Sequence, residues 1–128
     1  MTASFEMEAT ASKTVLILDA DPGLRRFVAK LLEPSGFLAA QVRSDHELLA
    51  ALGSLRPSLI IIDFAIAETS RVDLIGVLQR HHEWRRIPLL VVSDEHAMAF
   101  PVRVDAPIVY KPDRDGLADR IDSALRPN

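Results

Sequence analysis

The sequence of 128 residues contains no cysteine, which excludes disulfide bonds and thiolate metal sites. Its apolar runs are short, far below the roughly 18 residues that a membrane-spanning helix needs. No lysine or arginine run exceeds two residues, so the basic footprint typical of a nucleic-acid-binding protein is missing. The first dozen residues lack the basic start and apolar stretch of a secretory signal. We therefore expect a cytoplasmic protein without a membrane span or a nucleic-acid partner.

The composition is otherwise that of one globular domain. Apolar residues make up 48% and charged residues 26% of the chain, and the formal net charge is −3. A chain of this length buries a core without disulfide or metal staples. We expect a flexible tail over residues 1–12 and a single domain over residues 13–128.

Short apolar segments alternate with helical patterns along the chain, which is typical of βαβ units around a parallel sheet. Helices are expected to begin at Pro22 after Asp21 as N-cap, and after Ser44 or Asp45. Residues 72–82 and the segment carrying Leu117 and Ile121 form two further expected helices, whereas residues 64–70 are expected to be a loop. The expected strands are residues 14–18, 38–42, 59–62, 87–92 and 107–110.

The segment from residue 94 to residue 106 should hold a fourth helix of the fold, but Pro101 would break a long one. We expect this helix to be short or irregular. With exposed Met98 and Phe100, the segment is expected either to be mobile or to be ordered by a partner that covers those two side chains.

Polar residues stand at the ends of four of the expected strands, namely Asp19, Asp63, Ser93 and Lys111. With strand order 2-1-3-4-5, a doubly wound, flavodoxin-like α/β fold with helices on both faces brings these ends to one edge of the sheet. Two carboxylates there can bind Mg²⁺, and a carboxylate can also accept a phosphoryl group. Lysine and hydroxyl groups can stabilise the phosphoryl oxygens.

Four segments, residues 15–26, 56–63, 87–93 and 109–112, together resemble the receiver domain of bacterial two-component response regulators. The resemblance runs from residue 13 to residue 125 and agrees in order, spacing and strand context. It implies a signalling domain rather than an enzyme, phosphorylated by a histidine kinase or phosphotransfer protein. It also implies output through contacts with a downstream protein, and leaves a homodimer open.

The resemblance also implies roles for single residues. Asp63 corresponds to the phosphoacceptor, and Ser93 and Lys111 to the residues that stabilise the phosphoryl group. The implied switch and output face comprises Ser93, Ile108 and Tyr110. The implied Mg²⁺ ligands are Asp19, Asp63 and the backbone carbonyl of Ala65, with Asp21 as a further candidate. The bond between Lys111 and Pro112 is expected to be cis.

Several positions depart from the receiver pattern. Ala20 replaces the second acid after the first strand, which should weaken Mg²⁺ binding. Asp94 replaces the usual small residue after Ser93 and adds bulk and like charge. Ile108 stands where the switch aromatic is usual, and nearby Tyr110 is expected on the opposite face of its strand. In the segment after Asp63, Ala67 and Arg71 replace the usual proline and glycine.

Two other functions remain open. In the first, the domain is a pseudo-receiver, an interaction module that keeps the fold without phosphotransfer. In the second, Asp19 and Asp21 resemble the nucleophile and general acid of haloacid-dehalogenase phosphatases. That resemblance leaves Asp63 without a role, and no later acidic pair or cap domain accompanies it.

Overall fold

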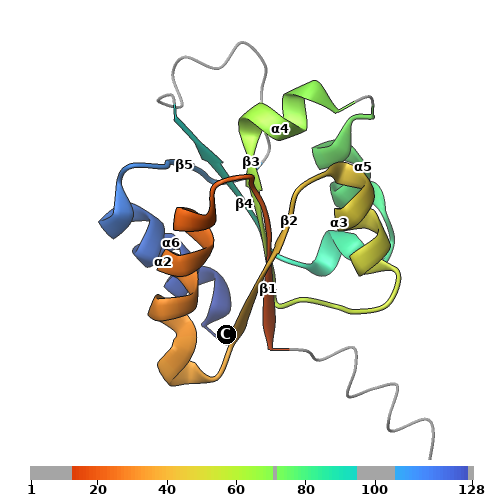
Figure 1. Cartoon of the computed structure of the whole chain (residues 1–128). Coiled ribbons are helices and arrows are strands. Elements are labelled where there is room, and N and C mark those ends of the chain that lie inside the picture. Colours follow the sequence, from red (N-terminus) through yellow and green to blue (C-terminus); the bar gives the residue numbers. More distant parts are fainter. Residues whose placement is uncertain (1–12, 71, 95–105, 127–128) are drawn as a thin grey trace, which may run out of the picture.

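The computed structural model describes residues 13–70, 72–94 and 106–126 (Figure 1). Its five strands form one parallel sheet in the order β2-β1-β3-β4-β5, which confirms the predicted strand order and fold class. The strands are β1 (Thr14–Leu18), β2 (Leu38–Val42), β3 (Leu59–Asp63), β4 (Leu89–Ser93) and β5 (Ile108–Tyr110). The reversal of strand order between β1 and β3 is the point at which such sheets commonly place their sites.

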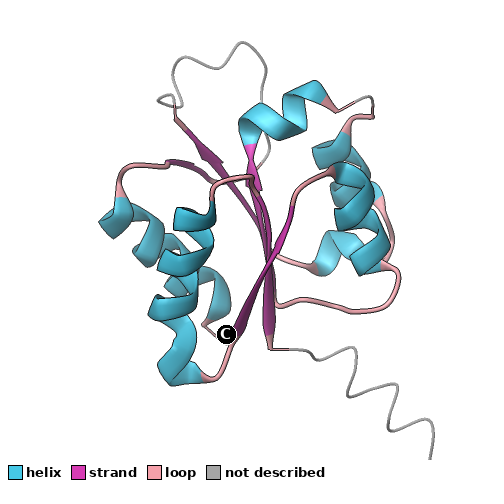
Figure 2. Ribbon diagram, viewed as in Figure 1, coloured by secondary structure: helices cyan, strands magenta, loops and turns pink. Residues whose placement is uncertain are grey.

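Helices cover both faces of the sheet, as Figure 2 shows. The core on one face is formed with α2 (Pro22–Leu32) and α6 (Arg114–Leu125). The core on the other face is formed with α3 (Asp45–Leu52) and α5 (Leu74–Arg80). β1 and β3 are buried on both faces, because successive side chains alternate between the two cores. Two short 3₁₀ turns, η1 (Glu33–Ser35) and η2 (Trp84–Arg86), complete the described elements.

Predicted helix caps are present where the sequence placed them. Asp21 accepts a hydrogen bond from the Gly23 N–H at 2.8 Å at the start of α2. Ser44 rather than Asp45 caps α3, accepting from the Glu47 N–H at 3.1 Å. Each cap satisfies one of the backbone donors that a helix leaves unpaired at its first turn.

The predicted loop over residues 64–70 was wrong, because α4 (Phe64–Thr69) follows β3 directly. The first turn of α4 is stabilised by Asp63 as its N-cap and by the burial of Phe64. The residues that follow include Ala65 and Ala67, which favour a helix once it has begun. The strand therefore passes into a helix at Asp63 itself.

The third predicted helix is shorter than residues 72–82. It begins after Asp73, whose side chain accepts from the Gly76 N–H, and ends before His81. The His81 Nδ1 atom accepts hydrogen bonds from the backbone N–H groups of Glu83 and Trp84, at 3.1 and 3.2 Å. This side-chain acceptor turns the chain into η2, and the His81 ring stacks on Trp84.

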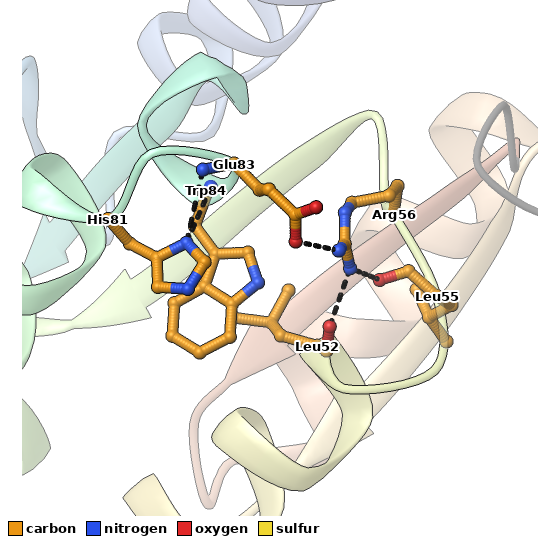
Figure 3. Close-up of polar contacts among 6 residues, drawn as sticks. All are labelled: Leu52, Leu55, Arg56, His81, Glu83 and Trp84. Carbon is orange, nitrogen blue, oxygen red and sulfur yellow. Dashed lines mark hydrogen bonds and ion pairs between the residues drawn. The ribbon is translucent and has the colours of Figure 1, made fainter.

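Arg56 ties the end of α3 to η2 (Figure 3). Its Nη1 atom donates to the carbonyls of Leu52 at 2.6 Å and Leu55 at 3.2 Å, and its Nη2 atom pairs with the Glu83 carboxylate. The guanidinium thus satisfies the Leu52 carbonyl, which the helix end leaves open, and the Leu55 carbonyl in the loop that follows.

Two expectations lie outside the described residues, namely the tail over residues 1–12 and the short or irregular helix with Met98, Phe100 and Pro101. In the part of the chain that the structure describes, no helix has both the length and the apolar character to cross a membrane.

Candidate functional site

The candidate site lies where β1, β3, β4 and β5 end. Asp63 is the last residue of β3, Ser93 is the last residue of β4, and Asp19 and Lys111 directly follow β1 and β5. Within the described ranges, these four residues are the only polar or charged ones that are buried. Burying charge is costly unless the group is paired, so this concentration of buried polarity marks the edge as a site.

Three of the four side chains meet around one ammonium group. The Nζ atom of Lys111 lies 2.9 Å from Oδ2 of Asp19 and 3.7 Å from Oδ2 of Asp63. Asp19 is 2% exposed, and Asp63 and Lys111 are each 8% exposed. The sequence predicted that the strand ends carrying Asp63 and Lys111 would meet at one edge of the sheet. The structure confirms this and places the ammonium closer to Asp19 than to Asp63.

Strand alternation explains why these three side chains share one face. Asp19 continues the alternation of Val15 and Ile17, whose side chains belong to the core beneath α2 and α6. By the same alternation, Asp63 lies on the face of Leu59 and Ile61, and Lys111 lies on the face of Val109. Ser93 is one residue beyond Val92, the partner of Asp63 in the register, and its carbonyl accepts from the Lys111 N–H at 2.6 Å.

Neighbouring groups hold the Asp19 carboxylate and its backbone in place. Its Oδ1 atom accepts from the Asp21 N–H at 2.9 Å, and the Gln41 side chain donates to the Asp19 carbonyl. Oδ2 of Asp19 is buried and has the Lys111 ammonium beside it, but no well-directed hydrogen bond from the described residues. Sequence reasoning missed Gln41, because a glutamine inside an edge strand carries no motif.

Burial is the main influence on the charge of Asp63. Desolvation raises the pKa of the Asp63 carboxyl, Lys111 opposes that rise, and the like charges of Asp19 and Asp94 add to it. Burial alone would lower the pKa of Lys111, but the adjacent Asp19 carboxylate and the charge of Asp63 outweigh it. The Lys111 pKa is therefore raised, and its ammonium stays charged between the carboxylates.

The candidate metal ligands are not all gathered in this cluster. Asp21 is exposed, and its carboxylate caps α2 rather than joining Asp19 and Asp63. Ala65 lies in the first turn of α4, and its N–H donates to Oδ1 of Asp63 at 3.4 Å. Helix carbonyls point toward the C-terminal end, so the Ala65 carbonyl is directed away from the carboxylates in this conformation. The reason is the helix that replaces the expected loop.

Comparisons with known proteins show what the chain is similar to in sequence and in fold. No family model matches the chain. It is 27% identical over 81 residues to the phosphate regulon transcriptional regulatory protein PhoB of Pseudomonas aeruginosa, covering 63% of this chain and 35% of that protein. It is 28% identical over 82 residues to the polar-differentiation response regulator DivK of Brucella ovis, covering 64% of this chain and 67% of that protein. The match to PhoB thus spans about a third of that relative's length.

Solved structures share the fold at low sequence identity. The signal receiver domain of a signal transduction histidine kinase from Syntrophus aciditrophicus has a TM-score of 0.69 and 23% identity, covering 88% of this chain and 89% of that chain. The Mn²⁺-bound form of response regulator Rcp1 has a TM-score of 0.65 and 18% identity, covering 86% of this chain and 91% of that chain. This chain resembles the response-regulator receiver domain in sequence and shares its fold.

Against the receiver pattern, the departures have defined places in the structure. Ala20 is exposed beside Asp19, so no carboxylate stands at the second acidic position. Asp94 is exposed next to Ser93, and its charge raises the pKa of both Asp63 and Lys111. Ala67 is half-buried in α4. Arg71 lies outside the described residues.

The expectation for Tyr110 was wrong. Ile108 and Tyr110 are two residues apart on β5, so strand alternation puts both on the same face, while Val109 between them is in the core. Both are half-buried. An aromatic ring therefore lies on the same face of β5 as Ile108, two residues later than in the receiver pattern.

The expected cis bond before Pro112 was also wrong. Every peptide bond between described residues is trans. The trans form is favoured by about 0.5–1 kcal/mol even before proline. With this bond trans, a hydrogen bond closes the turn after β5: the Asp113 N–H donates to the Tyr110 carbonyl at 2.9 Å.

Proposed function

We propose that this chain is a two-component receiver that accepts a phosphoryl group on Asp63 from a histidine kinase or phosphotransfer protein, and that signals through protein contacts. The observation that carries the proposal is the buried Lys111 ammonium, paired with Asp19 and facing Asp63 at the carboxyl edge of the sheet. The relatives named as regulators support the same signalling role. A cytoplasmic location stays a prediction.

In the proposed reaction an Asp63 carboxylate oxygen attacks the phosphorus of a phosphohistidine. The P–O bond forms as the P–N bond breaks, and the imidazole leaves with the electron pair and takes up a proton. The product is an acyl phosphate with more negative charge than the carboxylate it replaces. Lys111 stands 3.7 Å from Asp63 and can neutralise part of that charge, with Ser93 as the hydroxyl on the neighbouring strand.

The residues present fit a divalent cation with few protein ligands. Mg²⁺ usually keeps several waters and takes one or two carboxylates, and Asp19 and Asp63 are two carboxylates on one face of one edge. The buried Oδ2 atom of Asp19 is a hard oxygen donor that lies 2.9 Å from Lys111 Nζ, so a cation bound there would compete with the ammonium. Bound there, Mg²⁺ would neutralise charge on the transferring phosphoryl group. The described residues contain no cluster of three or more candidate ligands, so weak affinity is expected.

The test is incubation with acetyl phosphate and Mg²⁺, read by intact mass. The proposal predicts a gain of one phosphoryl group in the wild type and none in Asp63→Asn. Asp21→Asn is the matched control, because that carboxylate caps α2 outside the cluster. A gain that survives in Asp63→Asn but is lost in Asp19→Asn would favour the phosphatase-like site instead, since Asp19 is the nucleophile in that alternative.

A pseudo-receiver is the second candidate, and specific observations favour it. Lys111 is already paired with Asp19, Ala20 offers no ligand, and Asp94 adds negative charge beside the site. In this alternative, the buried charges serve only the fold, and partners bind a surface that phosphorylation does not control. No mass gain at saturating acetyl phosphate and Mg²⁺ would support it.

A further inference from the structure

β2 is an outer strand whose free edge is available for pairing. In the described sheet it pairs only with β1. The Leu38 N–H donates to the Lys13 carbonyl, and the Val42 carbonyl accepts from the Asp19 N–H. The backbone groups of Leu38, Ala40 and Val42 are therefore directed toward β1. Since these groups alternate along a strand, those of Ala39 and Gln41 face outward. A free edge of this kind is a template for another strand.

A groove of about 780 Å³ runs beside this edge, between β2 and the outer flank of α2. Its apolar lining comes from Phe27, Phe37, Leu38 and Ala39. Leu38 is 70% exposed, the most exposed large apolar side chain of the described residues. Strand edges are usually protected by charged or bulged residues, whereas β2 begins with an exposed leucine.

The same groove is strongly basic. Arg25, Arg26, Lys30 and Arg114 line it, against one acid, Glu33. None of the four basic residues forms an ion pair with any other described residue. This concentration of positive charge stands out on a chain whose net charge is −3.

Arg114 adds an observation independent of the charge count. Its guanidinium carbon lies 5.1 Å from the centre of the Phe27 ring, and its Nη1 atom is buried without an acceptor among the described residues. A buried donor without an acceptor is unfavourable, and a carboxylate is the acceptor that a guanidinium binds best. Arg114 therefore lines the groove with a charge that no described carboxylate pairs with, which favours a negatively charged occupant.

We propose that the β2 edge and the α2 groove bind an extended, acidic segment of a partner protein, which adds to the sheet as a sixth strand beside β2. Backbone groups of Ala39 and Gln41 pair with the segment, its apolar side chains cover Leu38, and its carboxylates meet Arg26, Lys30 and Arg114. This surface lies away from Ser93, Ile108 and Tyr110. Binding there needs no phosphoryl group on Asp63, so the proposed function can fail without affecting it.

Charge favours an acidic partner over a second copy of the chain. Antiparallel pairing of two β2 strands places the two α2 helices on the same face of the joined sheet. Each helix brings Arg25, Arg26 and Lys30 and contains no acidic residue. The like charges would oppose each other, whereas an acidic strand is attracted to them.

The test uses a short, blocked peptide that alternates glutamate with valine, and the unphosphorylated full chain. We expect binding that weakens with salt, and amide hydrogen exchange that slows at least about tenfold at Ala39 and Gln41. The amides of Ala40 and Val42, already directed to β1, should not change. The same peptide with alternate backbone amides N-methylated keeps its charge but cannot pair, and should bind at least about tenfold more weakly.

Charge reversal tests the groove separately. Arg26→Glu with Lys30→Glu should weaken binding of the peptide by about tenfold or more. Arg85→Glu with Arg120→Glu changes the net charge equally at exposed sites outside the groove, and should change binding less than about twofold. All four side chains are exposed, so the core is not altered.

Three results would overturn the proposal. The first is no detectable binding of the glutamate–valine peptide, and the second is equal affinity for the N-methylated peptide. The third is concentration-dependent dimerisation in sedimentation, with Ala39 and Gln41 protected before any peptide is added, because a second copy would then occupy the edge.

Discussion

Replacing Lys111 with methionine removes the ammonium between Asp19 and Asp63 while keeping a similar apolar stem. At an effective dielectric constant of about 20, unit charges attract by about 6 kcal/mol at 2.9 Å and about 4.5 kcal/mol at 3.7 Å. Desolvation of the buried charges offsets much of this attraction. Removing Lys111 is therefore expected to lower the free energy of unfolding by about 3–5 kcal/mol, the range found when one partner of a buried ion pair is removed.

Urea unfolding at neutral pH measures this loss as a shift in midpoint at constant slope. The matched control is Arg126→Met, which breaks an exposed pair with Asp122 and should cost less than about 1 kcal/mol. Adding Asp19→Asn to Lys111→Met should recover part of the stability, because one uncompensated charge is removed. If Lys111→Met costs no more than Arg126→Met, the ammonium does not hold the cluster together as described.

Three further predictions concern the metal, the pH dependence and the end of α3. Ala20→Asp should tighten Mg²⁺ binding at least about tenfold by calorimetry, since it adds a hard ligand, and Ala20→Asn should not. Folding raises the pKa of Asp63 above its usual value of 3.8. The carboxyl therefore contributes its full stabilisation of the wild type below pH 3.8, and this contribution is lost as the pH rises through the folded-state pKa. Asp63→Asn should remove that decline in urea titrations at successive pH values, and an unchanged decline would contradict this. Arg56→Met should cost about 1–3 kcal/mol, because the Leu52 and Leu55 carbonyls lose their donor, whereas Glu83→Gln should cost less than about 1 kcal/mol in the same assay.

The strands and their polar ends were predictable because their signals are local. Apolar runs fix β1, β3 and β4, and the residue after each run falls at the same sheet edge whatever the side-chain packing. The convergence of Asp19, Asp63 and Lys111 follows from strand alternation alone. The same rule, correctly applied, also places Tyr110 on the face of Ile108.

Other features depend on contacts that a single segment does not encode. α4 begins with Asp63 as its N-cap and with Phe64 buried, and neither feature is visible in the sequence around residue 65. The closer approach of Lys111 to Asp19 than to Asp63 depends on one side-chain conformation. The basic groove gathers residues of α2 and Arg114 that are far apart in sequence, so the short Arg25–Arg26 run gave little indication of it.

If Asp63 accepts the phosphoryl group, chemical labelling of the acyl phosphate should locate that group at residue 63. Borohydride reduces an aspartyl phosphate to homoserine, releasing phosphate, and leaves free carboxylates intact. After treatment with acetyl phosphate and Mg²⁺, peptide mass analysis should find homoserine at residue 63 and aspartate at residues 19 and 21. Homoserine at residue 19 or residue 21 instead, with aspartate retained at residue 63, would contradict the account.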